Sequence, residues 1–315
     1  MKLFRRIAAA LAVVAGFAVS AHAEAPTKIV IMHTGVAPYL AAFVAKDQGF
    51  FEKRGLDVTI KLGANGSVLM AALIAGSAQI ATPTPTIFLQ GVEGGLDVVA
   101  LASTNEFPDN TKSGLVARQG SGIKGPADLV GKKVGVPGIG GLLDVVLRKW
   151  LMDNKVDTTK VHFVETPFPP MADMLKADQI DAAVAVDPFL GRIVGSGSGY
   201  YVADYTKSIP AGAVGSVWAA TREWADKHPA AVKAFQEAIV EAIAFAKSNE
   251  KAARDSVLHY TKLPPQAVAH MVLPNLTAKM GPAQLQPWVD IAKAQGTIRK
   301  DIDVKKLIAP WRAGS

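Results

Sequence analysis

The sequence predicts an α/β protein of two lobes, and two observations support this fold class. From Pro26 onward, short apolar segments alternate with segments of helical periodicity, which is typical of a mostly parallel sheet covered by helices. The strand segments also form two groups, each too small for the whole chain, followed by one more strand and a long helical tail. We expect this tail to return to the first lobe, so that the chain crosses between the lobes near residues 117 and 214. Two crossings form a hinge, and the space between the lobes is then a cleft.

The first group of segments begins after Pro26. Gly76 ends one of its helices, because glycine follows the last position with helical periodicity. An extended segment at 113–120 closes the group. We expect strands at 28–32, 56–62, 78–83 and 96–103, and helices at 38–51, 67–76 and 86–92.

The second group leads into the helical tail. We expect strands at 132–136, 161–165 and 180–186, an edge strand at 200–204, helices at 141–154 and 169–178, and a short helix after Pro188. A last strand at 215–221 precedes a helix whose apolar residues recur at spacings of three and four. These residues are Val232, Phe235, Ile239, Ile243 and Ala246. We therefore assign 24–116 and 215–315 to the first lobe and 117–214 to the second.

The first residues have the order of a secretory signal peptide. Three cationic residues precede an apolar run at 7–19, and Ala21-His22-Ala23 supplies the small residues of a cleavage site. The run is shorter than the roughly 20 apolar residues that span a bilayer. An uncleaved membrane anchor is the alternative. We expect cleavage after Ala23 and a mature protein in the periplasm.

Composition excludes several classes of protein. The chain has no cysteine, which excludes disulfides, a lipid on an N-terminal cysteine, cysteine-ligated zinc and thiol nucleophiles. Without the leader, 31 Lys and Arg residues stand against 27 Asp and Glu residues, a net charge of +4 with no block of like charges. This mild charge indicates no nucleic-acid partner. The mature chain is long enough to bury two cores.

A glycine-rich segment, VGVPGIGGLLDVVLRKWL, starts at residue 134 and reads as strand, loop and helix. Gly138 and Gly140 match the first half of the dinucleotide motif G-x-G-x-x-G, but Leu143 occupies its last position. The motif of nucleotide hydrolases is absent as well. Such a loop can still present backbone N–H groups at a helix N-terminus to a ligand. Similar loops at 33–38, 63–67 and 82–86 also follow strands, which favours a shared ligand site over unrelated tight turns.

Four segments follow one another along the mature chain: PYLAAFVAKDQGFFEKRGLDVTI, ALIAGSAQIA, DLVGKKVGVPG and QIDAAVAVDPF. In these segments the chain resembles the periplasmic solute-binding proteins of ABC importers, in the nitrate, sulfonate and taurine (NMT1/THI5-like) group. The resemblance implies a type II fold whose two lobes close on a small solute. It also implies a monomer that delivers the solute to a membrane permease, without catalysis, cofactor or metal.

The resemblance also implies which residues line the cleft. They are His33, Thr34, Tyr39, Asn65, Gly66, Ser67, Thr82, Thr84, Asn105, Gly138, Gly140, Gly141, Asp187, Phe189 and Trp218. Several have a structural interpretation beside the functional one. Ser67 and Thr84 stand where helix N-caps belong, and Asp187 before proline is common in turns. His33 suits a hydrogen-bonded strand end, and Phe189 and Trp218 suit a core equally well.

The predicted site residues do not determine which solute is bound. Sulfonate or nitrate would suit N–H groups at helix termini, but the loops contain no arginine, and we expect Arg148 and Arg192 at the surface. Asp187 would pair with the amino group of a zwitterion such as taurine. Aromatic residues, among them Phe107, would suit a heterocyclic or aromatic solute.

Two other functions remain as alternatives. One is an enzyme on the same fold, as in pyrimidine synthesis, but the chain lacks cysteine, G-x-S-x-G and H-E-x-x-H, and His259 and His270 are not at metal-ligand spacing. The other is a receptor that reports its ligand to a membrane kinase. A DNA-binding regulator would need an added helix-turn-helix and a cytosolic location.

Overall fold

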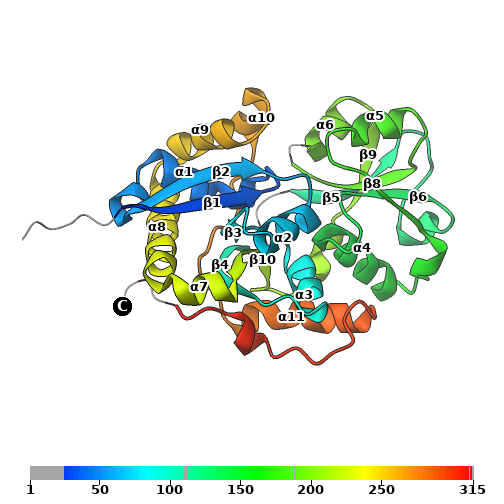
Figure 1. Ribbon diagram of the computed structural model, residues 1–315. Helices are drawn as coiled ribbons and strands as arrows, with labels where there is room; N and C mark the ends of the chain where they lie inside the picture. The colour runs from blue at the N-terminus through cyan, green and yellow to red at the C-terminus, as the bar shows by residue number, and fades with distance from the viewer. Residues whose placement is uncertain (1–24, 110–111, 188, 312, 314–315) are drawn as a thin grey trace, which may run out of the picture.

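The computed structural model describes residues 25–109, 112–187, 189–311 and 313, and the predicted leader lies outside them. The strands form two five-stranded sheets in separate lobes (Figure 1). The first sheet has the order β2-β1-β3-β10-β4, with β10 antiparallel to β3 and β4. Its strands are β1 (Thr27–His33), β2 (Leu56–Leu62), β3 (Ile80–Ala81), β4 (Val98–Glu106) and β10 (Val214–Thr221).

The second sheet has the order β7-β6-β8-β5-β9. Strands β6, β7 and β8 are parallel, whereas β5 runs antiparallel to β8 and β9. Its strands are β5 (Ser113–Arg118), β6 (Lys133–Val136), β7 (His162–Glu165), β8 (Ala182–Val186) and β9 (Gly199–Ala203). Strand β9 lies at an edge of the sheet, as the sequence predicts.

The predicted lobe boundary at residue 117 falls inside β5 and is wrong. Residues 114–117 are buried and pair with strands on both sides in the second sheet, so this segment belongs wholly to the second lobe. The first crossing therefore lies between Glu106 and Ser113, and the second between Ala203 and Val214. Local sequence does not distinguish a short buried strand from a crossing segment, because both are extended and apolar.

The helical tail packs on the first lobe, as the count of strands predicts. The amide of Gln236 in α8 donates to the carbonyl of Leu101 in β4 (2.8 Å), and Ile308 forms a bridge with Ala100. In α11, the indole of Trp288 donates to the carbonyl of Val214 (2.8 Å). The helices of this lobe are α1 (Leu40–Asp47), α2 (Gly66–Ile74), α3 (Pro85–Glu93), α7 (Arg222–Lys227), α8 (Pro229–Ser248), α9 (Glu250–Tyr260), α10 (Pro265–His270) and α11 (Pro282–Ala294).

Helix α1 is shorter than the predicted 38–51. It starts after a 3-10 turn at Ala37–Tyr39 and ends at Asp47. Gly49 follows with φ +69°, a left-handed conformation that cannot continue a helix. The apolar residues beyond it, Phe50 and Phe51, are buried without being helical.

Among its described residues, the second lobe has one long helix and two short ones, α4 (Leu142–Asp153), α5 (Met171–Lys176) and α6 (Phe189–Gly195). Helices α5 and α6 cover one face of the sheet, where Met171, Leu175 and Ile193 pack with Val116. Helix α4 covers the other face and also packs against α3 and α11 of the first lobe. One apolar cluster, which includes Leu89, Leu147 and Trp288, therefore extends across both lobes.

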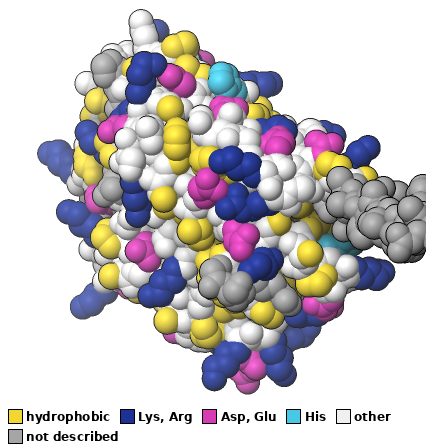
Figure 2. Space-filling view, turned by 90° about the vertical axis from the view of Figure 1, so that its left-hand side faces the viewer, with side chains coloured by type: hydrophobic (Ala, Val, Ile, Leu, Met, Phe, Trp, Pro, Cys, Tyr) yellow, Lys and Arg dark blue, Asp and Glu magenta, His cyan; other side chains and the backbone are white. Residues whose placement is uncertain are grey.

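The surface carries mixed charge. On the face of the first lobe shown in Figure 2, Lys and Arg side chains are interspersed with Asp and Glu. Ion pairs between partly exposed side chains, such as Arg54–Glu241 (2.8 Å), also occur. Within the described ranges, none of the helices has both the length and the apolar character needed to cross a bilayer.

Candidate ligand-binding site

Three of the predicted loops meet at one edge of the first sheet. Strands β2 and β3 both pair in parallel with β1, so their carboxyl ends lie side by side. The amide of Gly63 donates to the carbonyl of His33 (2.8 Å), and the amide of Thr82 donates to that of Met32 (3.1 Å). The loops at 33–38, 63–67 and 82–86 are thus held together.

Five predicted residues of the first lobe form one connected cluster. The hydroxyl of Tyr39 donates to the carbonyl of Thr82 (3.3 Å) and lies 3.3 Å from the hydroxyl of Thr34. The ring of Tyr39 makes edge contacts with His33 (5.9 Å between centroids) and Trp218 (6.2 Å). We call these residues the Tyr39 cluster; they are His33, Thr34, Tyr39, Thr82 and Trp218.

His33 in this cluster is a neutral hydrogen-bond donor. Its Nδ1 accepts the amide proton of Gly35 (3.0 Å), which places the ring proton on Nε2. The side chain is 1% exposed, and burial lowers the pKa of His33 from 6.5 to about 4. The imidazole is therefore uncharged at neutral pH.

Two N–H donors of the Tyr39 cluster have no protein partner among the described residues. They are Nε2 of His33 and Nε1 of Trp218, and both are buried. Trp218 lies wholly in the core, where its ring also contacts Phe235 of α8 (5.6 Å). Buried donors of this kind are completed by bound water or by an acceptor on a ligand.

The helices that start at these loops use some of the predicted side chains themselves. Asn65 caps α2, because its Oδ1 accepts the amide proton of Val68 (3.0 Å). Gly66 packs against Ile87 of α3. Thr84 precedes α3 and makes no capping bond; its hydroxyl instead lies 3.1 Å from that of Thr86. The N-cap is Asn65, so the prediction of a capping role for Ser67 is wrong.

Asn105 is a structural residue near the end of β4, just before the first crossing. It is buried, and its Oδ1 accepts from the hydroxyl of Thr104 (2.7 Å) while its amide donates to Asp109. Its side chain also fills the space beside Gly215, where any Cβ would collide with it. Both polar groups of Asn105 are therefore engaged within the protein.

In the second lobe, the glycine loop (residues 138–141) follows β6 and starts α4. The amide of Ile139 donates to Glu165 (3.3 Å), and that of Gly140 donates to Asp144 (2.8 Å). The amide of Gly141 donates to the carbonyl of Gly138 (3.0 Å). The prediction that this loop presents free N–H groups to a ligand therefore does not hold for these three. Two carboxylates of the protein occupy positions that an anion would take.

The loop after β8 carries the last two predicted residues. Asp187 Oδ1 accepts the amide proton of Gly191 (3.1 Å), so this carboxylate stabilises the start of α6. Phe189 stacks on Phe168, with centroids 5.1 Å apart and planes at 8°. Both aromatic rings are half-buried; Phe168 follows the carboxyl end of β7 and Phe189 that of β8, two parallel strands on either side of β6.

A family model described as NMT1/THI5 like matches residues 37–253, which is most of the chain. The chain belongs to the NMT1/THI5-like family. A Brucella abortus relative named as a binding protein is 29% identical over 222 residues, covering 70% of this chain and 67% of the relative. The nitrate/nitrite binding protein NrtA of a Nostoc species is 25% identical over 230 residues, covering 66% of this chain and 51% of NrtA.

Solved structures place this family member in the fold of periplasmic binding proteins. The aliphatic sulphonate binding protein SsuA of Escherichia coli superposes with a TM-score of 0.72 at 19% identity, covering 90% of this chain and 97% of SsuA. The nitrate-binding protein NrtA of Synechocystis gives a TM-score of 0.76 at 16% identity, covering 89% and 84%. Both neighbours are periplasmic binding proteins, and this chain shares their fold.

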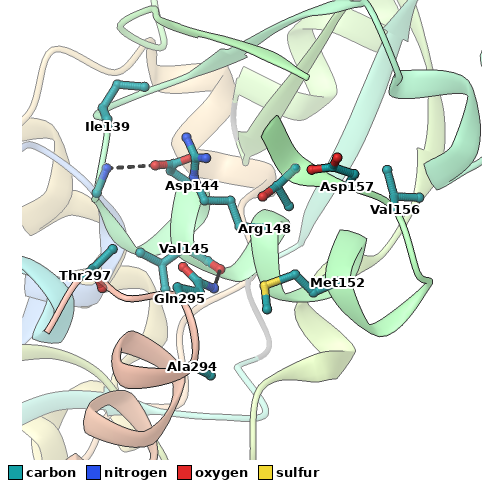
Figure 3. A pocket seen from close by; sticks show the side chains of 12 residues that line it. Ile139, Asp144, Val145, Arg148, Met152, Val156, Asp157, Ala294, Gln295 and Thr297 are labelled. Atoms are coloured by element: carbon teal, nitrogen blue, oxygen red, sulfur yellow. Dashed lines mark hydrogen bonds and ion pairs between the residues drawn. The ribbon is translucent and has the colours of Figure 1, made fainter. Parts of the chain in front are cut away.

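The structure of this family member also contains a cavity between the lobes, beside α4 (Figure 3). It has a volume of about 410 Å³, and Gly140 is the one predicted residue among those that line it. The second lobe contributes residues of α4 and the turn after it, and the first lobe contributes Ala294, Gln295 and Thr297.

Arg148 lines this cavity and its side chain is 25% exposed, so the predicted surface placement holds only in part. Its Nε donates to Asp144 (2.8 Å), and its guanidinium lies 3.7 Å from the centroid of the Phe163 ring. Arg192 is 53% exposed, so its predicted surface placement is confirmed, and it lies 3.6 Å from Asp173. The signal for Arg148 was present in the sequence, because Asp144 precedes it by four residues on the predicted helix.

Three further residues at the lobe contact were missed. Gln90 of α3 donates to the carbonyl of Gly140 (3.2 Å), and Gln295 donates to the carbonyl of Val145 (2.7 Å). Asp144 is buried, and this burial raises the pKa of its carboxyl. Among the described residues, no three His, Asp or Glu side chains lie close enough together to hold a metal ion.

Proposed function

We propose that this protein is the periplasmic substrate-binding subunit of an ABC importer. It captures a small solute, a sulfonate, taurine, nitrate or a similar compound, by closure of its two lobes, and delivers it to a membrane permease. In this proposal the mature chain starts after Ala23, acts as a monomer and catalyses no reaction.

One observation carries the proposal: the loops predicted to bind the solute follow the carboxyl ends of parallel strands in both sheets. Ligands of open α/β sheets bind at such ends. The two lobes are joined by two crossings, the arrangement that permits hinge closure around a ligand. The names of the relatives, which include a nitrate/nitrite binding protein, agree with the proposal.

The first lobe would hold the solute by hydrogen bonds and not by ion pairs. Residues 62–92 contain no charged side chain, and His33 is neutral at physiological pH. The Tyr39 cluster therefore supplies hydroxyl, N–H and aromatic groups only. These groups suit a small polar solute whose oxygen atoms accept hydrogen bonds.

A stability screen tests the proposal. We expect one member of a panel of alkanesulfonates, taurine, nitrate and pyrimidines to raise the free energy of unfolding by about 2.7 kcal/mol at 100 times its Kd. The solute should be recovered unchanged after prolonged incubation. Conversion of the bound compound, or no stabilisation by any member of the panel, would contradict the proposal.

A pair of tyrosine variants locates the site in the same experiment. Tyr39→Phe removes the hydroxyl that bonds to Thr82 and lies beside Thr34, so we expect the Kd to rise about fivefold, the effect of one lost hydrogen bond. Tyr201→Phe is the matched control, because Tyr201 is 47% exposed on β9. Equal affinities of the two variants would place the solute elsewhere.

A further inference from the structure

The two lobes are joined by hydrogen bonds at the first turn of α4. Gln90 in α3 and Gln295 after α11 both belong to the first lobe, and their amides donate to the carbonyls of Gly140 and Val145 in the second lobe. These positions lie 50 and 150 residues from their partners in the sequence. Helix α4 also contacts the first lobe through the apolar cluster that contains Leu89 and Trp288.

Asp144 is hydrogen-bonded to Gly140, the residue that makes one of these two contacts. Gly140 has φ +72°, and in this conformation its amide donates to Asp144 Oδ2 (2.8 Å) while its carbonyl accepts from Gln90. The other oxygen of Asp144 accepts from Arg148 Nε (2.8 Å), and the ring of Phe163 covers the guanidinium. The carboxylate is 1% exposed, so both of its hydrogen bonds form away from solvent.

Figure 3 shows the residues around this cavity from close by. Dashed lines mark the hydrogen bond from the glycine loop to Asp144 and the one between Gln295 and Val145. Asp144 and Val145 are consecutive in the sequence, so the same turn carries both links to the first lobe. A chain of contacts therefore runs from Arg148 through Asp144 and Gly140 to Gln90.

We propose that Asp144 is a positioning residue for the contact between the lobes. By fixing Gly140, it directs the Gly140 carbonyl toward Gln90 and so stabilises the lobe arrangement seen in this structure. The inference rests on the proposed function, since the lobe arrangement sets the fraction of protein that is competent to hold a solute. Asp144 itself need not touch the solute.

The first test measures amide hydrogen exchange in the glycine loop of the ligand-free protein. In Asp144→Ala we expect NMR-detected exchange of the Gly140 amide to accelerate roughly tenfold, because a charge-assisted hydrogen bond is lost. Asp144→Asn retains an acceptor oxygen and should restore most of the protection. Asp153→Ala is the matched control, since it removes the exposed Lys149–Asp153 pair (2.7 Å) four residues apart on the same helix.

A merely structural role would raise exchange throughout the second lobe, including the amides of β6. The proposal is overturned if Gly140 is unaffected in Asp144→Ala, or if all amides of the lobe accelerate equally. Should Asp144→Ala fail to fold, Gln90→Ala provides the second variant, because it removes the same link from the first lobe and leaves Asp144 in place.

The second test measures the distance between the two lobes. The chain has no cysteine, so spin labels at Asp226→Cys in α7 and Lys176→Cys in α5, both exposed, report one distance between the lobes. We expect Asp144→Ala and Gln90→Ala to shift or broaden the distance distribution of the ligand-free protein, and Asp153→Ala to leave it unchanged. Identical distributions in all variants would overturn the proposal. A failure of the proposed function would appear separately, as no stabilisation of the unmodified protein by any compound of the panel.

Discussion

At the scale of single residues, His33 predicts how stability depends on pH. Its pKa is about 4 in the folded protein against 6.5 ordinarily, so the unfolded chain takes up the proton first as the pH falls. Stability is therefore fully present above pH 6.5 and declines between pH 6.5 and 4, by up to about 3 kcal/mol.

His33→Gln tests this expectation, because glutamine does not titrate. In urea unfolding at pH 7.5, 5.5 and 4, we expect the free energy of the unmodified protein to fall relative to that of the variant. His228→Gln, which removes an exposed histidine, is the control. Parallel pH profiles for the unmodified protein and His33→Gln would show that His33 is not buried in its neutral form.

Residue types alone predicted part of the candidate site. His33, Thr34 and Tyr39 follow a strand with a clear apolar pattern, and the structure joins them in one cluster. Asn105 has the same local features but uses both of its polar groups within the protein. The difference depends on partners that only the fold supplies, so the sequence could not separate the two cases.

At the scale of elements, two glycines of one loop should respond differently to alanine. Gly140 has φ +72°, and an added Cβ would lie 2.9 Å from the Gln90 amide, so we expect Gly140→Ala to lose about 1 to 2 kcal/mol of stability. Gly138 has no atom within 4 Å of such a Cβ, and Gly138→Ala should be neutral or slightly stabilising. Urea unfolding measures both, and equal losses would contradict the conformation described for the loop.

Element types were largely predictable because hydrophobic periodicity differs between strands and helices. The ends of elements and the position of β5 were not, since β5 lies between two strands from later in the chain. The contacts of α4 with the first lobe could not be predicted from the sequence either, because their partners also come from distant parts of the chain. Gln90 and Gln295 carry no local pattern that indicates a partner 50 or 150 residues away.

At the scale of the whole molecule, the number of strands predicted two lobes, and the two sheets agree with that prediction. Each lobe buries its own apolar residues, while one further cluster extends from α3 and α11 to α4. Movement about the crossings would therefore repack the contact at α4 and leave both sheets intact.

The distance between the lobes tests the central claim most directly. With spin labels at Asp226→Cys and Lys176→Cys, we measure the distance distribution without ligand and with the stabilising solute at saturation. Capture by lobe closure predicts a shift to shorter distances and a narrower distribution when the solute is bound. A distribution that stays the same while the solute is demonstrably bound would contradict the account.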